Sequence, residues 1–212
     1  MKKLELVNIS KRYKNEQVLE NINLEFTDNK IYGFIGRNGS GKSVLFKIIC
    51  GFVLADTGNV MMDQQVLGKD MDFYDNLGAM IEIPGFIWHQ SGYENLLYLA
   101  RIRNRINSHQ VKEAIRLVGL DPCDKKWVGK YSMGMKQRLG IAQAIMEEPD
   151  LLILDEPMNS LDEQGVDEIR KLLCDYRQEG RIVLITSHYK QDIEMLCDEV
   201  YAIKYGKIEK IY

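Results

Sequence analysis

Eight consecutive residues, Gly36 to Ser43, have the types and spacing of a phosphate-binding loop, G-x-x-x-x-G-K-[ST]. Glycines let such a loop bend so that successive N–H groups face an anion, and the helix that follows adds its positive end. Lys42 is suited to the β- and γ-phosphates of a nucleotide, and Ser43 to Mg²⁺. A chance glycine-rich turn would lack the apolar stretch 31–35 before the loop and the helical pattern 43–50 after it. The predicted binding residues are Gly36, Asn38, Gly39, Ser40, Gly41, Lys42 and Ser43, with Lys42 also catalytic.

Two adjacent carboxylates, Asp155 and Glu156, follow the fully apolar stretch Leu151–Leu154. Such a stretch is typical of a parallel strand buried on both faces. Ligands of open α/β sheets bind at the carboxyl ends of strands, where these carboxylates can meet the phosphate-binding loop. Asp155 is suited to hold Mg²⁺, and Glu156 to orient or deprotonate an attacking water. A solvated turn is the alternative for this pair.

The patterning along the chain predicts three zones. The first third is rich in strands, the middle third is helical, and the last third alternates strand and helix, which favours a mainly parallel α/β sheet. Ser91 and Ser108 are predicted to cap helices, and residues 10–15 and 55–58 to form turns. The predicted strands are 3–9, 18–26, 31–35, 59–66, 77–81, 151–154 and 181–186, with a closing hairpin of 200–204 and 208–212, and the later helices are 132–148, 162–178 and 190–196.

Composition describes an ordinary globular protein of 212 residues, with 45% hydrophobic and 28% charged residues. The net charge of −3 gives no basic face for nucleic acid, so no nucleic-acid partner is expected. The four cysteines are scattered, as in reduced proteins of the cytoplasm. The first residues alternate and carry charge, unlike a signal peptide, and no apolar run reaches the ~18 residues of a membrane span.

The two motifs together resemble those of the ATP-binding subunit of ABC transporters, and the resemblance covers essentially the whole chain. This family carries a signature near Leu-Ser-Gly-Gly-Gln between them, and here the matching residues run from Tyr131 to Arg138. Ser132 and Gly134 match and are implied to bind the nucleotide held by a second subunit. Met133 replaces a glycine, which would strain the backbone if that position needs a positive φ. The implied fold is a single ABC-type P-loop NTPase domain, 1–212, with an N-terminal antiparallel β subdomain and a helical subdomain inserted at roughly 84–148.

The resemblance assigns further residues by their position in the chain. His188 matches the histidine that contacts the γ-phosphate, and we expect a catalytic role for it beside Glu156. Tyr13 matches the aromatic residue that stacks on adenine, although a tyrosine packed at a strand end is the alternative. Glu82 stands where the family usually has glutamine, and it is predicted to contact Mg²⁺ unless it is a plain surface carboxylate. Asp162 resembles a residue at the subunit boundary, and an ordinary helix N-cap is its other interpretation.

The implied function is that of an ATP-hydrolysing motor. Two copies, as a homodimer, would close on two ATP and Mg²⁺ and drive a separate transmembrane permease, from the cytoplasmic face of the membrane. Glu82 and the residues around the signature resemble the bacitracin and lantibiotic exporter and immunity branch, which favours export of an antimicrobial peptide, drug or similar compound. Phe86, Ile87 and Trp88 are candidates for the permease contact or for subdomain core. A soluble ATPase acting on ribosomes or DNA is the alternative function, and binding without turnover is a third.

Overall fold

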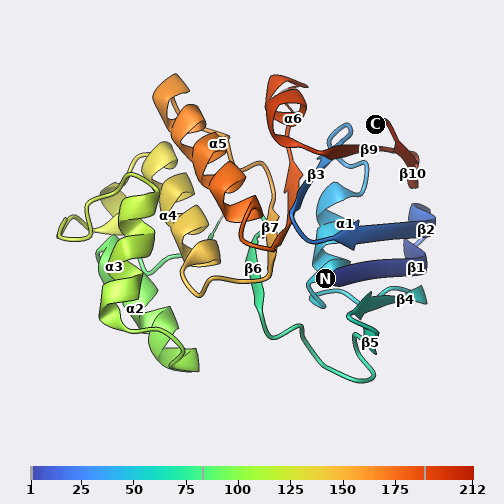
Figure 1. Cartoon of the computed structure of the whole chain (residues 1–212), viewed down its shortest axis with the longest axis horizontal. Helices are drawn as coiled ribbons and strands as arrows, with labels where there is room; N and C mark the ends of the chain where they lie inside the picture. Colours follow the sequence, from blue (N-terminus) through green and yellow to red (C-terminus); the bar gives the residue numbers. More distant parts are fainter. Residues whose placement is uncertain (1, 83, 189) are drawn as a thin grey trace.

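The computed structural model describes residues 2–82, 84–188 and 190–212, which form two β-sheets and the helices packed on them (Figure 1). The larger sheet has six strands in the order β10-β9-β3-β8-β7-β6. Its strands pair in parallel except for the closing hairpin of β9 and β10. They are β3 (Lys30–Ile35), β6 (Leu77–Met80), β7 (Leu151–Leu154), β8 (Ile182–Thr186), β9 (Glu199–Lys204) and β10 (Lys207–Lys210).

The central strands are apolar because both faces of the sheet are covered. Along β7, Leu151 and Ile153 face one core, which holds α1 (Lys42–Ile49) and the first strands of the chain. Leu152 and Leu154 face a second core, formed with the later helices. Those helices are α2 (Gly92–Arg103), α3 (Ser108–Leu117), α4 (Met133–Ile145), α5 (Glu163–Arg177) and α6 (Lys190–Leu196).

The smaller sheet is antiparallel, in the order β2-β1-β4-β5, and lies at the opposite end of the molecule from α2 and α3 (Figure 1). Its strands are β1 (Lys3–Tyr13), β2 (Glu16–Thr27), β4 (Thr57–Met62) and β5 (Gln65–Val66). This sheet and the helices inserted between β6 and β7 confirm the predicted fold class. None of the helices in the described ranges is long and apolar enough to cross a membrane.

Two predictions about the N-terminal strands were wrong in detail. The residues from Ser10 to Tyr13 continue β1 instead of turning, because they pair with β2 as far as Tyr13 opposite Glu16. The predicted strand 59–66 is a hairpin of β4 and β5. Asp63 and Gln64 reverse the chain there with positive φ angles of 49° and 72°.

The predicted cap of α3 was also displaced by one residue. Asn107, not Ser108, is the N-cap: its side-chain oxygen accepts from the backbone N–H of Gln110, and the Gln110 side chain accepts from the N–H of Asn107. Ser108 is the first helical residue instead. Asparagine is at least as good an N-cap as serine, because its side-chain oxygen accepts equally well from the first N–H groups of a helix.

Substitution of Asn107 by alanine is expected to lower the free energy of unfolding by about 1 kcal/mol, because two N–H groups lose their acceptor. Ser108→Ala is the matched control, since its side chain is exposed and outside the capping box. Its effect is expected within about 0.5 kcal/mol. Urea unfolding of the two variants measures both values, and equal losses would contradict the assignment.

Candidate nucleotide site

The phosphate-binding loop joins the end of β3 to the start of α1, and its glycines have a structural cause. Gly39 and Gly41 have φ angles of 78° and 106°, which disfavour a side chain. Gly36 is needed for space, since a β-carbon there would lie 2.6 Å from the Ser40 hydroxyl and 2.7 Å from the Ile203 carbonyl oxygen. The loop therefore adopts a conformation that this pattern of glycines allows.

Lys42 and Ser43 begin α1 and point into the site from the same helical turn. The Lys42 ammonium donates to the carbonyl oxygens of Gly36, at 2.8 Å, and Arg37, at 3.3 Å. The Ser43 hydroxyl donates to Asp155 Oδ2 at 2.7 Å. This last contact joins the loop to the end of β7, as the two motifs predicted.

Asp155 is held on both carboxylate oxygens by hydroxyl groups. Besides Ser43, Thr186 Oγ1 donates to Asp155 Oδ1 at 2.6 Å, and it also accepts from the backbone N–H of Glu156 at 2.8 Å. Thr186 ends β8, the parallel neighbour of β7. The carboxyl ends of β7 and β8 thus place hard oxygen ligands beside the loop.

Glu156 leaves β7 in a left-handed backbone conformation, with φ 53°, and its carboxylate meets His188. The backbone N–H of His188 donates to Oε2 at 3.1 Å, and His188 Nε2 lies 3.0 Å from Oε1. That second contact lacks hydrogen-bond geometry, so buried Oε1 has no hydrogen-bond partner within the described structure. Burial raises the pKa of Glu156 above its usual value, although the charge and N–H of His188 oppose the shift.

These groups surround one cavity of about 480 Å³ beside the loop. Two of its lining residues, Ser40 and Glu156, each hold a buried side-chain oxygen that has no hydrogen-bond partner among the described residues. Glycine-rich backbone, a lysine and paired hydroxyl and carboxylate oxygens fit a nucleotide phosphate with its metal. The lining residues are Glu16, Val18, Asn38, Gly39, Ser40, Gly41, Lys42, Ser43, Val44, Asp155, Glu156 and His188.

A second cavity, of about 620 Å³, lies along the same loop, and most of its lining surface is apolar. Gly36 lines this cavity and not the first. Its walls come from the start of β2, the end of β3 and the turn between β9 and β10. The loop therefore borders a polar cavity and a more apolar one.

The signature residues Ser132 and Gly134 are absent from the lining of the first cavity. Ser132 caps α4 by accepting from the N–H of Met135 at 3.1 Å. A β-carbon at Gly134 would lie 2.7 Å from the carbonyl oxygen of Ser160, so glycine lets these segments approach. Met133 is helical, 55% exposed and outside the positive-φ residues of the described chain, so the strain considered for it does not arise.

Tyr13 and Glu82 also lie outside the cavity lining. The Tyr13 ring is 45% exposed at the end of β1, with the Lys11 ammonium 5.4 Å from its centre. The Glu82 carboxylate pairs with Lys47 of α1 at 2.5 Å, and its side chain is 62% exposed. Glu82 is thus a surface ion-pair partner, and within the described part of the chain its carboxylate has no hydrogen bond or ion pair to Ser43 or Asp155.

Sequence reasoning missed two residues that contact the carboxylate pair, Asp155 and Glu156. Thr186 bridges Asp155 and Glu156, and Gln137 of α4 donates to the Glu156 carbonyl oxygen at 2.8 Å. The signal for Thr186 was present, because it ends a buried strand parallel to β7. Gln137 carried no separate signal, since its contact depends on how α4 packs.

Comparison with known proteins places this site in a family. The model of the family described as ABC transporter matches residues 19–159. An ABC transporter ATP-binding protein of Bacillus subtilis, YybJ, is 37% identical over 97% of this chain and 94% of its own length. The chain belongs to the ABC transporter family, as an ATP-binding subunit with ATPase activity.

Other relatives carry more specific names. A bacitracin transport ATP-binding protein, BcrA of Enterococcus faecalis, is 40% identical over 97% of this chain and 67% of its own length. A lantibiotic transport ATP-binding protein, SrtF of Streptococcus pyogenes, is 35% identical over 99% of this chain and 91% of its own. In fold, the chain is similar to a solved ATP-binding subunit of an ABC transporter, with a TM-score of 0.86, 23% identity and coverage of 98% and 90%.

Proposed function

We propose that this chain is the motor subunit of an exporter for an antimicrobial peptide, drug or similar compound. The observation that carries the motor role is the Ser43–Asp155 contact, which joins the phosphate-binding loop to the carboxylate pair in one cavity. The relatives named for bacitracin and lantibiotic transport support the class of compound. The ATPase activity of the family supplies the energy.

In the proposed reaction, the loop N–H groups and Lys42 hold the phosphates, and Lys42 stabilises charge that develops on the γ-phosphate. Ser43 and Asp155 would hold Mg²⁺, which would neutralise phosphate charge when bound. Their direct contact fits this role, and no set of three His, Cys, Asp or Glu in the described ranges offers a metal site by itself. Glu156 orients the attacking water and accepts its proton, while His188 contacts the γ-phosphate.

The finer assignments of the binding set belong to the same proposal. Tyr13 stacks on adenine, and its exposed ring at the end of β1 supports this role. Ser132 and Gly134, at the N-terminal end of α4, contact the γ-phosphate held by a second copy, with Asp162 at the subunit boundary. Asp162 also caps α5 by accepting from the backbone N–H of Gly165 at 3.0 Å, so its role as an N-cap is compatible with the proposed place at the subunit boundary. Glu82 reaches Mg²⁺ only after its pair with Lys47 opens.

A separate permease is the proposed membrane partner, and it would place the chain on the cytoplasmic face of the membrane. Of the three residues considered for this contact, Trp88 is 67% exposed, whereas Phe86 packs on the helical core. The permease surface is therefore proposed at Trp88 rather than at Phe86.

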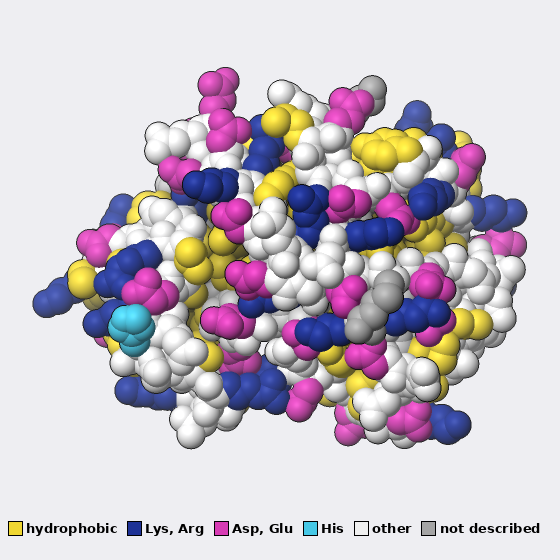
Figure 2. Space-filling view, viewed as in Figure 1, with side chains coloured by type: hydrophobic (Ala, Val, Ile, Leu, Met, Phe, Trp, Pro, Cys, Tyr) yellow, Lys and Arg dark blue, Asp and Glu magenta, His cyan; other side chains and the backbone are white. Residues whose placement is uncertain are grey.

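Acidic and basic side chains are interspersed on the face of the molecule that Figure 2 shows. That face has no continuous basic stripe of the kind that binds DNA or ribosomes.

The permease partner is tested with Glu156→Gln as bait in the native host. Membranes are solubilised gently with Mg-ATP, and the co-purifying proteins are identified. We expect a multi-spanning membrane protein in stoichiometric amount. Recovery of ribosomes, nucleic acid or a soluble dimer alone would contradict the proposal.

The exported compound is tested separately in a host that lacks the chain. We expect increased sensitivity to bacitracin or a lantibiotic, restored by the wild-type chain and not by Glu156→Gln. Unchanged sensitivity to peptide antibiotics would contradict the compound class without affecting the motor role.

The raised pKa of Glu156 predicts the acid side of the pH profile. The base is lost when Glu156 binds a proton, so kcat/KM for ATP falls as the pH drops through that pKa. Because burial raises the pKa, the fall is expected above pH 4.5, the ordinary value for a glutamate. Steady-state rates across the acid range measure it, and a midpoint at or below 4.5 would contradict the buried environment.

A further inference from the structure

A line of buried polar contacts lies behind His188, away from the residues that line the cavity. The Ser187 hydroxyl donates to Asp192 Oδ2 at 2.9 Å, and Arg170 donates to Asp192 Oδ1 at 2.5 Å. Ser187 is 4% exposed and Asp192 2%. Ser187 directly follows β8, Asp192 lies in α6 and Arg170 lies in α5.

The buried negative charge of Asp192 is balanced by the positive charge of Arg170. A carboxylate as buried as Asp192 is costly unless it is paired and hydrogen-bonded, and here a guanidinium and a hydroxyl supply both. Arg170 has a second partner, Asp167, whose carboxylate lies 3.0 Å from the guanidinium. The Asp167 side chain is 74% exposed. The buried and exposed carboxylates therefore share one guanidinium but have very different surroundings.

Ser187 connects this cluster to the carboxylate pair, Asp155 and Glu156, through its two neighbours in the chain. Thr186 before it is bonded to Asp155 and to the Glu156 N–H. His188 after it donates its N–H to Glu156 Oε2. Residues 186–188 are thus held by the carboxylate pair on one side and by Asp192 on the other.

We infer that Arg170 and Asp192 are positioning residues that act through Ser187 to hold the His188 amide against Glu156. This inference rests on the proposed hydrolytic role of Glu156. While Arg170, Asp192 and Ser187 keep these contacts, Glu156 Oε2 accepts from the His188 N–H, and Oε1 is left for water. Without these contacts, the segment carrying His188 shifts, and the base loses the orientation that a productive attack requires.

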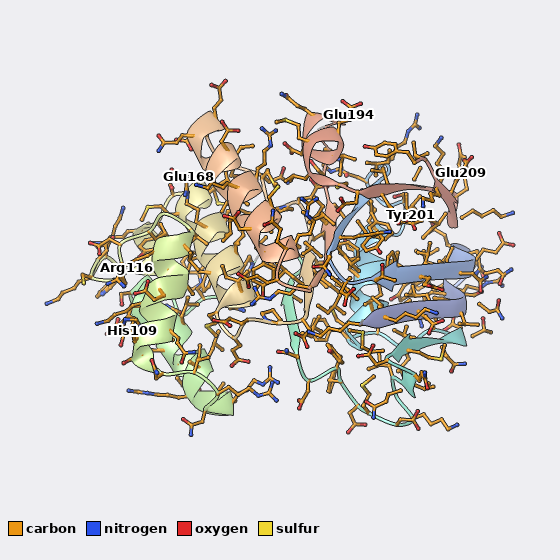
Figure 3. The ribbon with its side chains drawn as sticks, in the orientation of Figure 1. His109, Arg116, Glu168, Glu194, Tyr201 and Glu209 are labelled. Atoms are coloured by element: carbon orange, nitrogen blue, oxygen red, sulfur yellow. The ribbon has the colours of Figure 1, made fainter. Side chains whose placement is uncertain are left out.

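Through Arg170, the cluster also links the carboxylate pair to α5. Figure 3 labels Glu168 on α5 and Glu194 on α6, each two residues from a member of the Arg170–Asp192 pair. The start of α5 is capped by Asp162, and the preceding Ser160 packs against Gly134 of α4. Through Arg170 and Asp192, residues 186–188 are thus connected to α5 as well as to α6.

The test compares Ser187→Ala and Asp192→Asn with Asp167→Asn, the matched loss of the exposed partner of Arg170. The purified full chain is assayed for kcat and KM with Mg-ATP, for the Kd of a fluorescent ATP analogue and for Tm. We expect kcat to fall about 10-fold in the first two variants, similar to the smaller losses of activity seen when the hydrogen-bond partners of metal ligands are removed. KM and Kd are expected to stay within about 2-fold, and Asp167→Asn to keep its kcat within about 2-fold.

Ser187→Thr is the rescue variant, because threonine retains the hydroxyl, and it is expected to recover most of kcat. A Ser187→Ala variant that keeps full kcat, or loses Tm alone, would overturn the inference. So would an equal loss of kcat and ATP affinity, which indicates general disruption. If Asp192→Asn does not fold, the Ser187 pair decides, since it changes a single hydroxyl. A wild-type chain without ATPase activity would overturn the proposed function itself, and the inference with it.

Discussion

Glu156→Gln is expected to abolish turnover while leaving ATP binding intact. Glutamine keeps the shape of the side chain and can still accept from the His188 N–H. It cannot take a proton from water at neutral pH, and removal of a general base costs about 10²- to 10⁴-fold in rate. Phosphate release therefore falls by at least about 100-fold, while the Kd for ATP stays within about 2-fold.

The same variant is expected to accumulate as a dimer with Mg-ATP. Hydrolysis normally lets the closed, ATP-bound dimer reopen, and this variant does not hydrolyse ATP. Size-exclusion chromatography with light scattering measures the dimer, with and without nucleotide. Glu163→Gln is the matched control: this exposed glutamate in the first turn of α5 lies outside the cavity lining. Wild-type turnover in Glu156→Gln would show that another group is the base.

The sequence was most informative where one buried strand determined what followed it. The apolar run Leu151–Leu154 favoured a covered parallel strand, so the carboxylates after it were expected at the ligand-binding edge, and the structure has this strand as β7. The loop could be predicted for a similar reason, since Gly39 and Gly41 have φ angles that disfavour other residues. Local physics determines both features, and both were found.

Features that depend on packing between distant segments were harder to predict. Glu82 and Lys47 are 35 residues apart, and their ion pair follows from how the segment after β6 lies on α1. Thr186 acquires its role only when β8 lies beside β7. The predictions for Ser132 and Gly134 concern a nucleotide held by a second subunit, and the prediction for Tyr13 concerns an adenine outside the phosphate cavity. None of the three residues lines that cavity, so these roles stay predictions.

Lys42→Ala is expected to weaken ATP binding by about 100-fold, because hydrogen bonds to charged groups contribute about 1.5–3 kcal/mol each. Lys42 is 7% exposed, and its ammonium donates to the loop carbonyls of Gly36 and Arg37, so it is held where the loop curves. Alanine removes the charge but keeps the helical start of α1, since it is the best helix former. The fold should therefore survive, with Tm close to wild type.

The measurement is equilibrium binding of a fluorescent ATP analogue, repeated at several salt concentrations. Because the lost contribution is a charge–charge attraction inside a partly closed site, we expect the wild-type affinity to fall with salt more steeply than that of the variant. Lys171→Ala is the control, since it removes an exposed lysine from α5, far along the chain from the loop. Near-normal affinity in Lys42→Ala would contradict the loop assignment. An equal loss of affinity in both variants would trace the effect to the change in net charge. It would then not depend on the position of the Lys42 ammonium in the loop.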